Sequence, residues 1–267
     1  MKKIGFIGCG NMGGALAQAV AKASTGAELL LCDSAQDKVA ALSSVTGGVS
    51  ADLLTLAETA DVIFLGVKPQ GLAGLFEILA PILKKRKDEF LLISMAAGIS
   101  MSYICELAGR DCSVIRIMPN TPVAVGEGMI LYDANNAVTK VQESDFLSML
   151  EKAGKLDRLN EASIDAASAL SGCGPAFVYL FAEGLADGAV ECGLPRQKAN
   201  LYAAQTLLGA ATLLLESGKH PGELKDAVCS PGGTTIAGVH ALETGAFRAD
   251  ASSAVLAAYK KTLELKK

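Results

Sequence analysis

Three glycines near the start of the chain form a pattern that can hold a phosphate. Residues 8–13 read GCGNMG, between an apolar stretch and a helical pattern over residues 11–23. Gly8 would permit the sharp turn, Gly10 would let a pyrophosphate approach the backbone, and Gly13 would let helix and strand pack closely. The start of the helix would present its N–H groups to the phosphates. The pattern predicts dinucleotide binding, and the alternative is a glycine-rich turn without a ligand.

An acidic residue follows at the spacing expected for a ribose contact. Asp33 directly follows the apolar stretch 28–32 and lies about twenty residues after Gly13. A carboxylate there accepts hydrogen bonds from ribose hydroxyls and repels a 2′-phosphate, which favours NADH. Ser34 and Lys38 could instead receive a phosphate, and Asp33 could equally be the N-cap of the next helix. The choice between NADPH and NADH stays open.

Three further turns follow predicted strands and are candidates for contact with a cofactor. They are VKPQ at 67–70, SMAAGIS at 94–100 and MPNTP at 118–122. In open α/β sheets, ligands lie outside the carboxyl ends of the strands. The alternative is that these are only proline-shaped connections to helices. Lys68 is the one charged side chain in these turns, and a turn lysine is more often solvated than catalytic.

The stretch CSPGGTT at 229–235 combines a tight turn with the predicted start of a helix. The first N–H groups of a helix have no partner inside it and lie at its positive dipole end, so they can bind a carboxylate. The hydroxyls of Thr234 and Thr235 add donors at the same place. The stretch therefore indicates an anion site, and the alternative is an ordinary N-cap.

Composition argues against several kinds of partner. The chain has 267 residues, a net charge of −4 and no long basic run, so neither nucleic acid nor an anionic membrane is expected. The basic cluster at 84–88 is expected to be a solvated helix end. The two histidines, His220 and His240, have no other metal ligands nearby, so no metal site is expected.

The cysteines and apolar runs favour a cytoplasmic protein. The seven cysteines are odd in number and lack CxxC spacing, which is typical of free thiols in the cytosol. Glycines interrupt the apolar run after Met1, so no secretory signal is expected. The apolar run 201–215 is too short to span a bilayer and is expected to be a buried helix, which would also suit an oligomer interface.

The first part of the chain alternates apolar strands with helical patterns. The strands are predicted at 3–8, 28–32, 61–67, 89–94 and 113–119, with helices at 11–23, after residue 33 and at 70–83. This order is typical of a Rossmann-type α/β domain, a parallel doubly wound sheet covered by helices on both faces. Residues 128–134 and 155–160 would extend the sheet around a helix at 139–153.

From residue 161 onward the pattern is helical. Helices are predicted at 162–191, 195–217, 221–228, 233–244 and 250–265. SGCGPAF at 171–177 interrupts the first of them, which indicates a kink, a close backbone approach or a break between two helices. We therefore predict a dinucleotide-binding Rossmann domain over 1–160 and an all-helical domain over 161–267.

These segments together resemble one family, the pyrroline-5-carboxylate reductases, which catalyse the last step of proline synthesis. The resemblance rests on IGFIGCGNMGGAL, GVKPQ, SMAAGIS, RIMPNTP, SGCGPAF and HPGELKDAVCSPGGTTIAGVHALE, which run from residue 4 to residue 243. It implies hydride transfer from NADPH or NADH to the C=N carbon of 1-pyrroline-5-carboxylate, giving L-proline. Such a reduction needs positioning and desolvation more than a strong side-chain base.

The resemblance also implies roles for individual residues. On the cofactor side, the pyrophosphate would be held by Gly8, Gly10, Asn11, Met12 and Gly13. The adenosine and nicotinamide side of the crevice would be lined by Val67, Lys68 and Pro69. The nicotinamide would lie by Ala97, Asn120 and Pro122. On the substrate side, Ser230, Gly232, Gly233 and Thr234 would bind the carboxylate. Thr235 would hydrogen-bond the imine nitrogen and help to deliver its proton.

The family further implies a homodimer of interleaved C-terminal helices, and larger rings such as a decamer. Asp33 departs from the family's pattern, because members that prefer NADPH often have a neutral or basic residue there. Two other hypotheses compete. A Rossmann reductase of β-hydroxy acids would be expected to use a lysine within 162–191, which contains none. A nucleotide-binding sensor without catalysis would not need the intact glycine and threonine segments.

Overall fold

The structure, a computed structural model, describes residues 2–23 and 26–265. The chain forms two compact units. The sheet unit comprises the chain up to Cys173 together with the end of the last helix from Ala258, and the helical unit comprises Gly174–Ala257.

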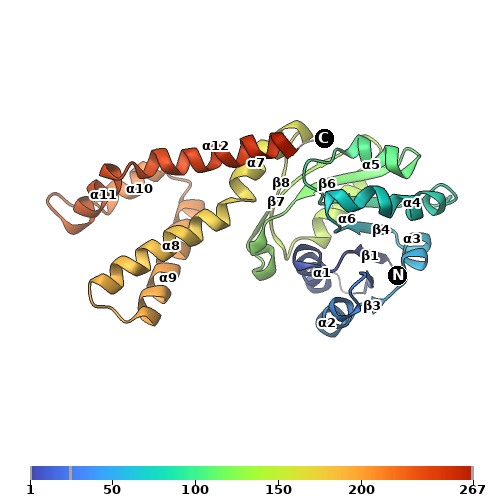
Figure 1. Cartoon of the computed structure of the whole chain (residues 1–267), viewed down its shortest axis with the longest axis horizontal. Coiled ribbons are helices and arrows are strands. Elements are labelled where there is room, and N and C mark those ends of the chain that lie inside the picture. The colour runs from blue at the N-terminus through green and yellow to red at the C-terminus, as the bar shows by residue number, and fades with distance from the viewer. Residues whose placement is uncertain (1, 24–25, 266–267) are drawn as a thin grey trace. The chain divides into compact units, whose positions relative to one another are not determined.

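The sheet unit is built on one sheet of eight strands in the order β3-β2-β1-β4-β5-β6-β7-β8 (Figure 1). The strands are β1 Lys3–Ile7, β2 Glu28–Cys32, β3 Val49–Ser50, β4 Val62–Leu65, β5 Leu91–Ser94, β6 Ser113–Met118, β7 Gly128–Ala134 and β8 Gly154–Arg158. All neighbours pair in parallel except β6 and β7. The predicted Rossmann-type sheet and its extension by two further strands are confirmed.

Helices cover both faces of this sheet. They are α1 Asn11–Ala23, α2 Gln36–Thr46, α3 Leu53–Thr59, α4 Leu72–Leu83, α5 Met101–Ala108, α6 Lys140–Met149 and α7 Glu161–Ser171, with short 3₁₀ turns η1 Pro69–Gly71 and η2 Thr121–Val125. Helices α3 and α5 were not predicted from the sequence. Both are short, and each begins at a side-chain cap, Asp52 for α3 and Ser100 for α5.

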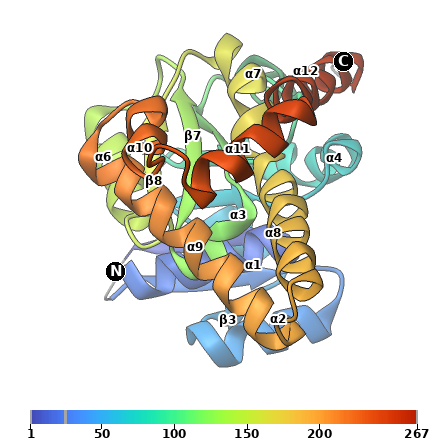
Figure 2. The same cartoon turned by 90° about the vertical axis from the view of Figure 1, so that its left-hand side faces the viewer.

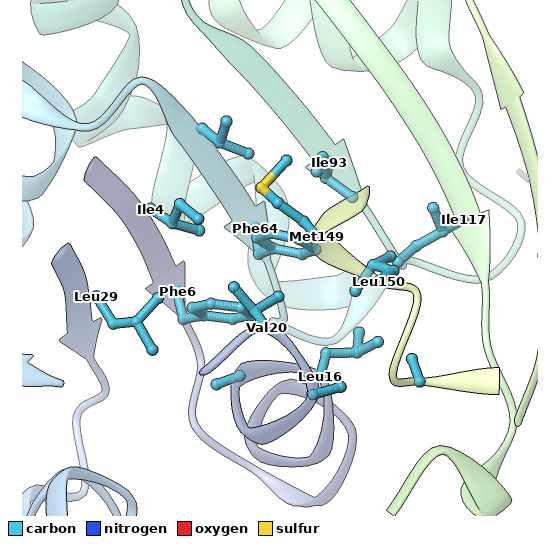
Figure 3. Close-up of a cluster of buried hydrophobic side chains, with 14 of the residues drawn as sticks. Ile4, Phe6, Leu16, Val20, Leu29, Phe64, Ile93, Ile117, Met149 and Leu150 are labelled. Atoms are coloured by element: carbon cyan, nitrogen blue, oxygen red, sulfur yellow. The ribbon is translucent and has the colours of Figure 1, made fainter. Parts of the chain in front are cut away.

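The core lies in two layers, one on each face of the sheet. Along β4, Phe64 packs into the layer beneath α1 and α6, whereas Ile63 and Leu65 pack into the opposite layer with α3, α4 and α5. Figure 3 shows the first layer, in which the rings of Phe6 and Phe64 stack with centroids 4.4 Å apart. Burial on both faces explains why these strands are continuous apolar runs without polar alternation.

The basic cluster at 84–88 is not simply a solvated helix end. The guanidinium of Arg86 is buried and donates to the carbonyl oxygens of Ala57 and Ala60, at 2.9 and 2.8 Å. It also pairs with Asp88 and lies over the ring of Phe90. The prediction was wrong for Arg86, because a guanidinium can satisfy buried carbonyls that no backbone N–H reaches.

The helical unit contains only helices and turns, as predicted. They are α8 Gly174–Glu191, α9 Arg196–Ser217, α10 Pro221–Ala227, α11 Thr234–Thr244 and the first part of α12 Phe247–Leu265. Helices α8 and α9 lie side by side (Figures 1 and 2), and the turn between them contains Gly193 with φ 96°. Glycine favours this left-handed conformation, which is common just after the end of a helix.

The helical unit has very little core of its own. Its buried hydrophobic cluster consists of Ala186, Ala199 and Ala203, all small side chains of α8 and α9. The apolar run 201–215 was expected to be buried, but most of its large side chains are exposed in the single chain, including Leu208 at 57% and Leu215 at 75%. A surface of this kind marks an interaction site.

One described stretch, Glu161–Glu191, has the length and apolarity of a membrane span, and 17% of its most apolar window is buried. It is not one continuous helix. Helix α7 ends at Ser171 and α8 begins at Gly174, so SGCGPAF is a break between two helices. A Cβ at Gly172 would lie 2.8 Å from the carbonyl oxygen of Ser168, which explains the glycine at the break.

We expect Leu16→Ala to destabilise the sheet unit strongly. Leu16 is fully buried between α1 and the sheet (Figure 3), so its truncation leaves a cavity that costs about 2–5 kcal/mol in the free energy of unfolding. Val141→Ala on α6, where the side chain is 70% exposed, is the control and should change it by less than about 0.5 kcal/mol. Urea unfolding followed by circular dichroism measures both, and equal effects would contradict the assignment of this core.

Candidate functional site

The turn from β1 to α1 requires glycine for two different reasons. Gly8 has φ 100°, and a Cβ there would lie 2.7 Å from the carbonyl group of Gly66 at the end of β4. A Cβ at Gly13 would lie 2.1 Å from the carbonyl oxygen of Gly8. The main chains of β1, β4 and α1 therefore meet without intervening side chains, as the predicted roles of Gly8 and Gly13 require.

Gly10 differs from its two neighbours because its surroundings are open. Apart from Gly10 and its two chain neighbours, no atom lies within 4 Å of the position that its Cβ would take. Asn11 is exposed and begins α1, whereas Met12 packs against the core. A surface cavity of about 480 Å³ adjoins this turn, lined by residues that include Gly10, Asn11 and Lys38. A main-chain turn that faces open space at a helix N-terminus fits the pyrophosphate of a dinucleotide.

The carboxylate of Asp33 is hydrogen-bonded to the glycine turn, the turn between β1 and α1 at residues 8–13. Its two oxygens accept hydrogen bonds from the backbone N–H groups of Cys9 at 2.7 Å and Ala35 at 2.9 Å. Burial alone would raise the pKa of Asp33, but these N–H groups and the nearby Lys38 outweigh it and hold the pKa below its ordinary value. Asp33 is therefore ionised at neutral pH.

The alternative assignment of Asp33 as a helix N-cap is wrong. The N-cap of α2 is Ala35, which has no side-chain capping bond. Asp33 instead closes a local turn two residues earlier, and the exposed Ser34 hydroxyl lies 3.5 Å from its Oδ1. The carboxylate thus positions the end of β2 against the glycine turn.

The predicted contact residues after β4 and β5 lie at the same sheet edge as the glycine turn, because these strands are parallel to β1. Val67 is half-buried against the core, Lys68 is exposed at the start of η1, and Pro69 is the first residue of η1. Ala97 is exposed in the turn that follows β5. Exposed and small side chains at this edge leave the main chain accessible to a ligand.

Asn120 and Pro122 follow β6, and η2 packs against α1. The side-chain amide of Asn120 is already engaged with the main chain. Its Nδ2 donates to the carbonyl oxygen of Ser171 at 2.9 Å, and its Oδ1 accepts from the N–H of Met129 at 2.9 Å. Asn120 therefore holds the connection between β6 and β7 in place and joins it to the last turn of α7.

A buried ion pair that the sequence analysis missed holds α7 on the sheet. Arg116 on β6 and Asp165 on α7 are each 2% exposed, and their Nη2 and Oδ1 atoms are 2.5 Å apart. Glu161 lies 3.6 Å from the same guanidinium and accepts the N–H of Met101 at 2.8 Å. The available signal was an arginine inside an apolar strand, which needs a buried acidic partner.

The turn at 229–235 lies in the helical unit. Gly232 has φ 66°, and Gly233 is the N-cap of α11 and donates its N–H to the carbonyl oxygen of Ser230 at 3.0 Å. No side-chain capping bond occupies the start of α11, so the alternative of an ordinary side-chain N-cap is not borne out. Thr234 and Thr235, in its first turn, are exposed. The first N–H groups of the helix and two hydroxyls are therefore available to an anion.

Two family models match the chain. One, described as NADP oxidoreductase coenzyme F420-dependent, matches residues 3–98. The other, described as pyrroline-5-carboxylate reductase dimerisation, matches residues 161–265. The first covers the glycine turn, Asp33 and the turns after β4 and β5, and the second covers the whole helical unit.

Individual relatives match over nearly the full length. Pyrroline-5-carboxylate reductase of Pisum sativum is 40% identical over 98% of this chain and 95% of its own. A solved reductase of the same name from Coxiella burnetii has a TM-score of 0.90 at 33% identity, covering 99% of this chain and 98% of that one. Pyrroline carboxylate reductase of Plasmodium falciparum, solved with NADP bound, has a TM-score of 0.87 at 31% identity, covering 100% and 98%.

We expect Gly10→Ala to weaken dinucleotide binding without weakening the fold. The new methyl group meets no protein atom, so it obstructs only a ligand that approaches the turn. The dissociation constant for NADPH or NADH should rise at least about tenfold, a loss of about 1.4 kcal/mol. Gly74→Ala on α4, where a Cβ also meets nothing, is the matched control and should leave binding unchanged. Isothermal titration calorimetry distinguishes them, and unchanged binding in Gly10→Ala would disprove this placement of the pyrophosphate.

Proposed function

This chain belongs to the pyrroline-5-carboxylate reductase family, and we propose a role for each of its two units in the family's reaction. It is an NAD(P)H-dependent oxidoreductase that reduces 1-pyrroline-5-carboxylate to L-proline, the last step of proline biosynthesis. The observation that carries this function is the full-length similarity, at about 40% identity, to reductases of that name. The geometry of the two candidate sites supports the division of roles.

The sheet unit binds the dinucleotide in this proposal. The open turn at Gly10 and the start of α1 at Asn11 receive the pyrophosphate, with Gly8, Met12 and Gly13 supporting the turn. Val67, Lys68 and Pro69 line one side of the crevice, and Ala97, Asn120 and Pro122 line the nicotinamide side. When bound, the reduced nicotinamide supplies the hydride. The chain's own residues orient it and exclude water.

Asp33 sets the cofactor preference in this proposal. Its carboxylate is ionised at neutral pH, so it repels a 2′-phosphate and accepts a ribose hydroxyl. The exposed side chains of Ser34 and Lys38 offer a hydroxyl and a positive charge close by. The repulsion and this attraction oppose each other, so both NADPH and NADH are proposed as reductants.

The helical unit binds the substrate carboxylate at the turn before α11. The main chain at Gly232 and Gly233 and the hydroxyls of Ser230 and Thr234 would surround the carboxylate at the positive end of the helix dipole. This arrangement needs no histidine or metal ion. Binding of the carboxylate would hold the ring of the substrate in place and leave its C=N carbon accessible to the hydride.

Thr235 serves the imine nitrogen in this proposal. Reduction of the C=N bond adds a hydride to carbon and a proton to nitrogen. The Thr235 hydroxyl, in the first turn of α11, would hydrogen-bond the nitrogen and help to deliver that proton. A protonated imine is already electrophilic, so positioning by one hydroxyl is sufficient.

The functional division proposed for the chain is 1–160 for the dinucleotide and 161–267 for substrate binding and dimerisation. The match of the dimerisation model to 161–265 and the exposed apolar side chains of α8 and α9 support a homodimer. A larger ring such as a decamer is proposed from the family resemblance. The seven free cysteines favour a cytoplasmic location.

The proposed reaction is tested by the loss of nicotinamide absorbance on adding 1-pyrroline-5-carboxylate, in parallel with NADPH and NADH. We expect turnover with both, and the ratio of the two kcat/KM values measures the effect of Asp33. Gly10→Ala protein is the control for a folded chain with impaired cofactor binding. Absence of turnover from folded protein that still binds either cofactor would contradict the function.

We expect Thr235→Ala to lower kcat by about 10²-fold with a smaller change in KM, because the hydroxyl acts at the reacting nitrogen. Thr235→Ser keeps the hydroxyl and should retain most of the activity. Thr244→Ala at the other end of α11 is the matched control, since that hydroxyl only bonds the carbonyl oxygen of His240. Unchanged kcat and KM in Thr235→Ala would remove Thr235 from the mechanism.

A further inference from the structure

Two cysteines of the sheet unit, far from the glycine turn, are in contact with each other. Cys105 is in the last turn of α5, and Cys112 directly precedes β6. Gly109, with φ 64°, ends α5 and donates its N–H to the carbonyl oxygens of Cys105 and Glu106. The chain therefore reverses tightly, and the two Sγ atoms come within 3.8 Å of each other.

The main chain around the two sulfur atoms is held in place by one side chain. The Nδ2 of Asn135, which follows β7, lies 2.9 Å from the carbonyl oxygen of Cys112 and 3.7 Å from the Sγ of Cys105. Its Oδ1 accepts the N–H of Val114 at 3.2 Å. These bonds hold the main chain of Cys112 in place, and a disulfide needs the two sulfurs to close from 3.8 Å to about 2.05 Å.

The two thiols differ in how they meet solvent. Cys112 is 7% exposed, and burial together with the neighbouring Cys105 raises the pKa of its thiol to about 12. Cys105 is half-buried, and both residues line a surface cavity of about 1000 Å³ that also includes Arg110 and Asn135. A small oxidant can therefore reach Cys105, with Cys112 directly behind it.

We infer that Cys105 and Cys112 form an oxidisable dithiol, which a hydroperoxide converts into an intramolecular disulfide. With hydrogen peroxide, the sulfur of Cys105 attacks one oxygen, the O–O bond breaks, and the leaving oxygen takes the thiol proton, so the products are a sulfenic acid and water. The sulfur of Cys112 then displaces the hydroxyl group, which leaves as a second water with the thiol proton. The thiols lose two electrons in total, and the hydroperoxide gains them.

The place of this pair in the fold indicates what the bond does. Cys112 lies at the amino end of β6, whereas the glycine turn and the turns after β4, β5 and β6 lie at the carboxyl ends of the strands. The disulfide would form at the opposite edge of the sheet from the crevice. Oxidation would therefore leave turnover intact, and the nearby Cys112 would intercept the sulfenic acid of Cys105 before irreversible oxidation.

The experiment treats the folded enzyme with hydrogen peroxide, blocks the remaining thiols with N-ethylmaleimide and digests it with trypsin. Cleavage after Lys87, Arg110 and Arg116 places the two cysteines in separate peptides, 88–110 and 111–116. We expect these peptides to be joined, with a loss of two hydrogens, and to separate after reduction with dithiothreitol.

Three variants make the outcome specific. Cys105→Ser and Cys112→Ala should each abolish the joined peptide, whereas Cys192→Ser, at an exposed cysteine, should leave it unchanged. In Cys112→Ala, Cys105 should progress to the sulfinic acid. If wild-type Cys105 becomes sulfinic acid while Cys112 stays free, the inference is overturned.

Turnover after peroxide treatment tests the second part of the inference. Wild-type enzyme and a variant that combines Cys105→Ser with Cys112→Ala should keep the same fraction of their activity, because any loss through other thiols is common to both. A loss that appears only in the wild type, in step with the joined peptide, would overturn the claim that the disulfide leaves the crevice unaffected.

Discussion

The meeting of bare main chain at Gly8, Gly13 and Gly66 is the constraint on which the sheet unit depends. Each position would place a Cβ within 2.1 to 2.7 Å of the main chain of another member of the set. Because these three glycines have no Cβ atom, α1 lies directly against the ends of β1 and β4. In the same layer the rings of Phe6 and Phe64 stack, and buried side chains of α1 pack against them.

Several polar side chains near the glycine turn hold the elements around it in place. Asp33 joins the end of β2 to the glycine turn, and Asn120 joins the β6–β7 connection to α7. The buried pair of Arg116 and Asp165 fixes α7 beneath them. A reduction that depends on orientation rather than on a strong base suits such a scaffold, because its positions are set before a ligand arrives.

Much of the sheet unit could be predicted from sequence because its strands are buried on both faces and read as unbroken apolar runs. The roles of Gly8 and Gly13 could be predicted because steric exclusion acts locally. Arg86 and the Arg116–Asp165 pair could not, since their partners are distant in sequence and only the tertiary fold brings them together. Helix α9 was misjudged for a related reason. Its apolar composition indicates burial, but it does not distinguish burial within the same chain from burial against a second copy.

The small core of the helical unit has a consequence for how the enzyme matures. Helices α8 and α9 share only three buried alanines, so a newly synthesised chain gains little by folding this half alone. The strands and helices up to Cys173 have large cores on both faces of the sheet and can fold before the end of the last helix has left the ribosome. In the proposed homodimer the second half would gain its stability by pairing, which would make maturation a second-order process. The delay between synthesis and the appearance of working enzyme should therefore shorten as the local concentration of nascent chains rises.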